Sequence, residues 1–160
     1  MRQRFEQQLS LGVTPISEVE IRTKSRDEMP PLLVALQTIF VTEELSEQVF
    51  AILEERICKN KKVTGRPGMD LWHILVLSLV RHACNTNWDK LHYYANNDMT
   101  MRNIMGLHNN EFGEGFHQFE YQNILDNVSL LDAETIDKIN SVVVGYGMKL
   151  LKKKKMKDFN

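Results

Sequence analysis

Residues 71–80 of the chain read LWHILVLSLV, and this stretch decides the fold. Apolar side chains occupy nearly every position, so a helix here would be apolar on almost all of its faces. The length of the run favours a helix over a buried strand, and Asp70 is placed to cap it. We therefore predict a helix from Leu71 to about Cys84 that other elements surround on most sides.

Helices are also predicted before and after this central one. Pro30 fits the first turn of a helix, and apolar residues then recur at helical spacing. Thr42 is a good N-cap for the next helix, whose apolar stripe has a period of about 3.6 residues. Near the end of the chain, Asp132 caps a helix that we expect to run from Ala133 into the C-terminal lysines.

Two short helices are predicted directly after the central one, with a polar turn at residues 96–98 between them. Trp88 and Leu91 share a face of the first, and Gly106 suits the left-handed position that ends the second. This spacing is typical of a helix-turn-helix, and helical hairpins in general share it. The predicted fold class is an all-α, compact bundle of six to eight helices containing this helix-turn-helix-like pair.

The composition fits one globular domain. The chain has 160 residues, of which 42% are hydrophobic and 26% charged, so it can bury a core. We expect a weakly structured N-terminal arm over residues 1–27, a helical domain over 28–148 and a basic tail over 149–160. Two cysteines are too few for a disulfide scaffold, and no signal sequence or membrane-spanning run of roughly 18 apolar residues is visible.

Positive charge is concentrated in two places. Residues 149–160 carry six lysines against one aspartate, a net charge of +5, which leaves −6 on residues 1–148 of a chain whose total is −1. A second basic window, residues 56–66, holds five lysines and arginines and no acid. This distribution favours local contacts to a polyanion, although a charge run is usually a solvated surface.

Signatures of catalysis and of metal binding are sparse. The chain has no phosphate-binding glycine loop, no nucleophile elbow and no zinc-protease motif. His82 and Cys84 form one pair of potential zinc ligands, but no second pair stands at the required spacing. We therefore name no catalytic residue, no metal ligand, no cofactor and no small-molecule substrate for this chain.

The candidate DNA-binding residues are cations and groups that can read or stack on bases. Lysine and arginine neutralise phosphates, arginine suits guanine edges and asparagine suits adenine edges. Trp88 is expected to pack inward, whereas Tyr93 lies off the apolar face and can stack on a base. The candidates are Lys61, Lys62, Arg66, Lys90, Tyr93, Arg102, Asn103, Lys152, Lys153, Lys154 and Lys155.

Three segments together resemble the N-terminal region of bacterial insertion-sequence transposases of the ISNCY type, within the DDE superfamily. They are GRPGMDLWHILVL at 65–77, WDKL at 88–91 and MRNIMGL at 101–107. The resemblance covers roughly residues 28–148. It implies a helical region that binds double-stranded DNA at the terminal inverted repeats of a mobile element, in the bacterial cytoplasm and associated with the nucleoid.

Strand transfer in that family belongs to an RNase H-like domain whose carboxylates hold divalent metal, Mg or Mn. The resemblance places such a domain after residue 160, so we expect this chain to be a truncated transposase without catalytic competence of its own. The alternative interpretation is a helical oligomerisation or protein-interaction domain. In that case two copies would pair through the last helix, by Ile136, Ile139, Val143 and Tyr146.

Overall fold

The computed structural model describes residues 2–5, 13–22, 26–58, 68–108 and 116–158. Within these ranges the chain forms seven α-helices, one short 3-10 helix and no strand, which confirms the all-α class and the expected number of helices. In chain order the elements are η1 (Ile16–Glu18), α1 (Met29–Val41), α2 (Glu43–Ile57), α3 (Leu71–Ala83), α4 (Trp88–Asn97), α5 (Met99–Ile104), α6 (Tyr121–Val128) and α7 (Ala133–Asp158).

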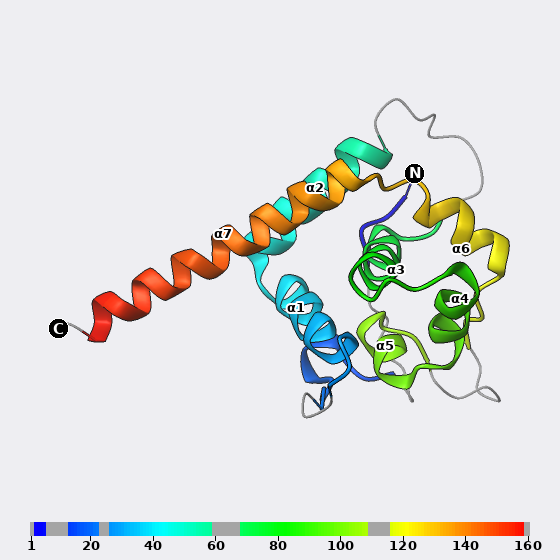
Figure 1. The fold of residues 1–160 in the computed structure, drawn as a ribbon, viewed down its shortest axis with the longest axis horizontal. Helices are drawn as coiled ribbons and strands as arrows, with labels where there is room; N and C mark the ends of the chain where they lie inside the picture. The colour runs from blue at the N-terminus through cyan, green and yellow to red at the C-terminus, as the bar shows by residue number, and fades with distance from the viewer. Residues whose placement is uncertain (1, 6–12, 23–25, 59–67, 109–115, 159–160) are drawn as a thin grey trace.

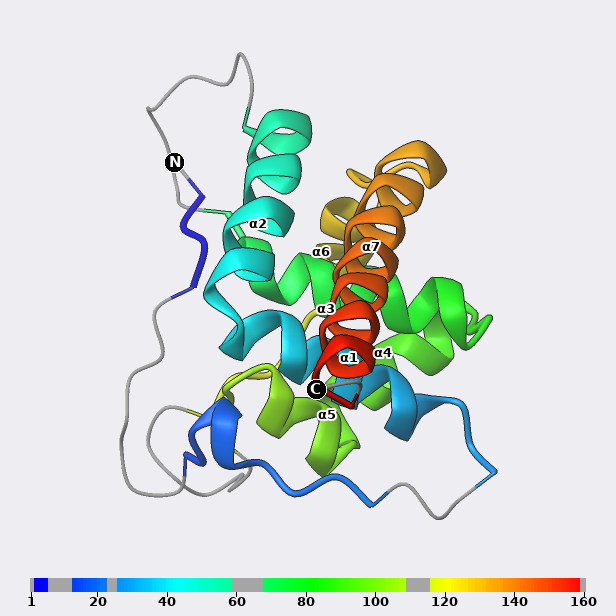
Figure 2. The same ribbon diagram turned by 90° about the vertical axis from the view of Figure 1, so that its left-hand side faces the viewer.

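The apolar helix α3 lies among the other helices, as its composition predicts (Figures 1 and 2). Every residue from 71 to 80 is buried, and Trp72 has no exposed surface. Helices α1, α2, α4 and α6 all contact α3. Burying one large apolar side chain contributes roughly 1.5–3 kcal/mol, so this helix supplies a large part of the core's free energy.

The two halves of the 26-residue helix α7 differ in their surroundings. α7 packs along α2, and its Ile136 and Ile139 are buried there, while Val143 and Tyr146 pack against the core from its edge. The C-terminal half extends away from the body, as Figure 1 shows, and Figure 2 looks toward this end. The face that we predicted to pair two copies is therefore covered by the chain's own core, and that prediction is wrong.

Residues 2–5 bind the start of α3 and replace the expected cap. The backbone N–H groups of Leu71 and Trp72 donate to the carbonyl oxygens of Gln3 and Arg4, at 3.0 Å each. Asp70 makes no side-chain cap bond, so the predicted role of Asp70 is wrong. The first N–H groups of a helix need acceptors from outside it, and here a distant segment supplies them.

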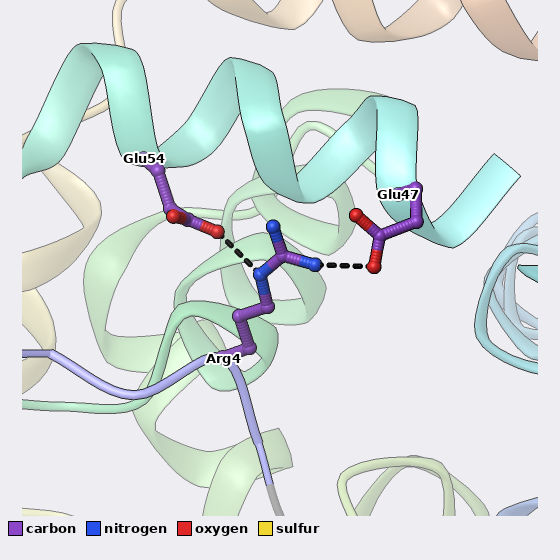
Figure 3. Close-up of polar contacts among 3 residues, drawn as sticks. All are labelled: Arg4, Glu47 and Glu54. Carbon is purple, nitrogen blue, oxygen red and sulfur yellow. Dashed lines mark hydrogen bonds and ion pairs between the residues drawn. The ribbon is translucent and has the colours of Figure 1, made fainter. Parts of the chain in front are cut away.

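The Arg4 side chain fixes the same segment to α2 (Figure 3). Its guanidinium donates to Glu54 and, over 2.6 Å, to Glu47. Further along, Ile16 and Val19 are buried in the core. The expected boundary at residue 28 is therefore wrong, because the core includes side chains that precede it.

At the other helix starts, side-chain caps form at three positions, of which Asp132 was predicted. The side chains of Asn87, Asp98 and Asp132 accept from backbone N–H groups in the first turns of α4, α5 and α7. Thr42 precedes α2 but makes no such bond. After α5, Gly106 adopts a φ of 74°, the left-handed conformation that glycine takes without a steric cost.

Candidate nucleic-acid interface

Among the residues that the structure describes, exposed cations are most concentrated at the lysine end of α7, residues 149–157. Lys152, Lys153, Lys154 and Lys155 are all exposed, and no ion pair among the described residues neutralises them. Lys149 is one turn nearer the body, and its Nζ atom lies 3.5 Å from the Oε1 atom of Glu44 on α2. Successive helical residues are about 100° apart, so four consecutive lysines direct charge to all sides of the helix.

Two further candidates, Lys90 and Tyr93, lie on α4. Both are exposed, and the Lys90 Nζ atom lies 5.5 Å from the centre of the Tyr94 ring. The Tyr93 ring is 62% exposed and lines an open depression of about 570 Å³. Polar side chains from α4, together with Phe116 and Gln118, line the rest of it. A base could stack on Tyr93 from solvent, as the sequence predicts.

Arg102 is buried, contrary to the prediction that α5 presents it to DNA. Its side chain is 2% exposed and donates to three backbone carbonyls, those of Ala95, His108 and His117, each at 2.8 Å. The guanidinium also lies 4.5 Å from the centre of the Phe116 ring. Burial lowers the pKa of Arg102. This arginine therefore holds the chain segments around α5 together, and the prediction that it reads a base edge is wrong.

The position of α5 against α3 explains why Arg102 faces inward. The Trp72 Nε1–H group donates to the Ile104 carbonyl over 2.8 Å, and His73 Nε2 lies 2.8 Å from the Met105 carbonyl. Two ring nitrogens of α3 thus bind the C-terminal end of α5. A single residue, Asp98, separates α4 from α5, whereas we expected a three-residue turn. Asn103 is half-buried on this short helix.

Those predicted DNA-binding residues that the structure describes do not form one continuous surface. Helix α4 and the lysine end of α7 lie at opposite ends of the molecule's longest axis (Figure 1). Lys61, Lys62 and Arg66 lie outside the described residues. The structure therefore separates a strongly cationic helix end from a weaker site on α4.

Sequence reasoning missed a group of exposed apolar side chains on the outer face of α7. Val144, Met148 and Leu151 are 60%, 62% and 61% exposed. The stripe predicted for this helix is the buried one, whose members lie on the opposite side. The signal was present in the sequence, since these three residues are spaced by four and three positions.

Neither a metal centre nor a membrane span is found in the part of the chain that the structure describes. No group of three or more histidine, cysteine, aspartate or glutamate side chains is placed to hold a metal ion there. None of the described helices is both long enough and apolar enough to cross a bilayer. No protein-family model, no curated protein and no solved structure matches this chain.

Proposed function

We propose that this chain binds double-stranded DNA through the lysine end of α7, as the DNA-binding part of a bacterial insertion-sequence transposase. The observation that carries the proposal is the exposure of four consecutive lysines on a helix end that extends from a body of opposite net charge. The acidic body would repel DNA, so contact is directed to the strongly cationic end of α7.

The chemistry of this contact is neutralisation of phosphates. Each lysine that meets a phosphate releases a condensed counterion, and this release supplies affinity that falls steeply with salt. An α-helix fits the major groove of B-form DNA, whose two walls are phosphate backbones. Lysines on all sides of a helix can contact both walls at once, which one charged stripe could not do.

Phosphate contacts position a protein on DNA, whereas base contacts specify the sequence. With Arg102 buried, α5 contributes no arginine to base recognition, so the proposal assigns α7 a role in affinity. Recognition of terminal inverted repeats, which the resemblance implies, is a separate property from this affinity for phosphates.

A purely structural role for the lysines makes different predictions. Cations near the C-terminus of a helix interact favourably with the helix dipole, by about 0.3–1 kcal/mol each. If that were their only role, replacing them would lower the helix content or the melting temperature and leave the binding of DNA unchanged.

The experiment compares two variants in which four cations become glutamine. One changes Lys152, Lys153, Lys154 and Lys155, and the matched control changes the exposed Arg22, Arg26, Arg56 and Lys138. Both lose the same charge, so a general electrostatic effect would weaken them equally. We expect the α7 variant to bind a labelled duplex on the order of 100-fold more weakly at low salt, and the control to lose much less.

The same titration is run with an inverted-repeat duplex from the ends of an insertion sequence and with a scrambled duplex. The lysine substitutions should weaken binding to both duplexes alike, because phosphates carry no sequence. Equal losses in the two variants, or wild-type protein that binds no duplex at low salt, would overturn the proposal.

A further inference from the structure

The outer face of α7 carries an apolar stripe with no partner among the described residues. Val144, Met148 and Leu151 are each about three-fifths exposed. Steps of four and three residues place them on one side of the helix. That side is opposite to the one where Ile139 and Val143 pack against the body.

The same spacing continues beyond the apolar stripe in both directions. Toward the body it reaches Ser141 and then Asp137, and toward the C-terminus it reaches Lys155. All three side chains are exposed. The outer face therefore reads, in order, acidic, polar, three apolar and basic positions, in the alternating steps of four and three that pairs of packed helices use.

We propose that two copies of the chain associate through this face, with their α7 helices antiparallel. In the antiparallel register, Met148 faces the partner's Val144 and Leu151 faces the partner's Ser141. Lys155 then faces the partner's Asp137. The twofold axis repeats each of these pairs, so both ends of the contact carry an ion pair and the apolar residues lie in the centre.

The charges along the outer face favour the antiparallel arrangement of two copies over the parallel one. A parallel pair would place two lysine ends side by side and two Asp137 carboxylates opposite each other, and both contacts are repulsive. The antiparallel pair separates the lysine ends and joins each acid to a base. Most lysines at the helix end lie off the stripe, so the pairing does not depend on the proposed binding of DNA.

The contact is small. It centres on six apolar side chains, three from each copy, so we expect an association that depends on concentration instead of a permanent dimer. Because the three residues are exposed in the single chain, replacing them should leave the fold intact. This makes the surface testable without loss of the protein.

The first test measures the mass of the protein by sedimentation equilibrium, without DNA, over concentrations up to about 1 mM. Wild-type protein should form dimers, and the triple variant V144Q/M148Q/L151Q should stay monomeric. The matched control, V34Q/V41Q/M99Q, replaces three apolar residues that are exposed elsewhere and should dimerise as the wild type does. Wild-type protein that remains monomeric at every concentration would overturn the proposal. Monomeric protein that sediments with phosphatidylserine vesicles would assign the outer face to a lipid surface, and this result would overturn the proposal as well.

The second test exchanges the charges at the ends of the stripe. D137K and K155D should each weaken the dimer about tenfold, because each turns two attractive pairs into repulsive ones. The double variant D137K/K155D should restore the wild-type dissociation constant, since each new lysine faces the partner's new aspartate. Failure of the double variant to recover, while the single variants are weakened, would contradict the antiparallel register.

Discussion

Two cationic regions of this molecule differ in their exposure to solvent. Arg102 on α5 is almost completely buried, and three backbone carbonyls hold its guanidinium. The four lysines near the end of α7 are exposed on the part of the helix that extends away from the body. Both regions looked like DNA contacts in the sequence. The comparison shows that the surroundings of a cation decide whether it stabilises the fold or remains available to a polyanion.

The physical reason for the difference lies in the helices that carry the charges. Trp72 and His73 bind the end of the six-residue helix α5 against α3, and three of its side chains, those of Met101, Arg102 and Ile104, are buried. No described element covers the last two turns of α7. An arginine can be buried when its N–H groups find carbonyl acceptors, whereas a run of lysines stays in water.

The largest effect on the free energy of unfolding is expected for Arg102→Met. The substitution leaves three partly or wholly buried carbonyls without their donor, at about 1–3 kcal/mol each, so we expect a loss of at least about 3 kcal/mol. Arg56→Met, the control, removes an exposed ion pair with Asp132 and should cost much less. Urea unfolding followed by circular dichroism measures both changes.

The same variant separates folding from binding. At a temperature where Arg102→Met is folded, its affinity for DNA should equal that of the wild type. A stable Arg102→Met protein with weakened DNA binding would show that the buried arginine belongs to the interface after all.

The next largest effect concerns His73, whose ring binds the Met105 carbonyl within the same region. Burial lowers the pKa of His73 to about 4, from 6.5 in an exposed histidine. Between these values the unfolded chain binds a proton that the folded chain does not, so stability is complete above pH 6.5 and falls as the pH drops toward 4. The loss is about 3 kcal/mol.

His73→Gln keeps a side-chain N–H donor and removes the titration. Urea unfolding at pH 7 and pH 4 should show that the wild type loses about 3 kcal/mol more than the variant over this interval. The difference between the two proteins cancels the contributions of other titrating groups. Equal pH dependence in both would mean that His73 does not stay neutral in the folded state.

Much of the fold was predictable because local signals and burial agree. The apolar run of α3 required a surrounded helix, and Asn87, Asp98 and Asp132 cap the helices that follow them. The start of α3 was not predictable, since its acceptors are carbonyls of Gln3 and Arg4, far away in the sequence. Local patterns contain no information about which distant segment supplies a hydrogen bond.

The candidate site was predictable in its composition but not in its orientation. The lysines of α7 are exposed because no described part of the chain packs against that end. The sequence places Arg102 on a polar face of its helix, yet three backbone carbonyls and the Phe116 ring surround its guanidinium. The outer stripe of α7 could have been found from its spacing alone, because Val144, Met148 and Leu151 repeat the steps of the buried stripe on the other side.

The smallest expected effect on the affinity for DNA comes from substitutions on α4. Lys90→Gln removes at most one phosphate contact, and Tyr93→Ala removes an exposed ring, so we expect each to change the affinity for duplex DNA by about twofold or less. Single-stranded DNA is the sharper probe for Tyr93, because stacking on an exposed ring needs an unpaired base. A loss with duplex as large as that of the four α7 substitutions would place α4 in the same interface.

The most direct measurement of the central claim is the salt dependence of duplex binding by the full chain. If the lysine end of α7 holds the phosphates, a plot of log affinity against log salt concentration should have a slope of about −4 to −5. Replacing Lys152, Lys153, Lys154 and Lys155 by glutamine should make that slope shallower by about 3 to 4. An unchanged slope in this variant would contradict the claim, because the affinity would then come from other residues.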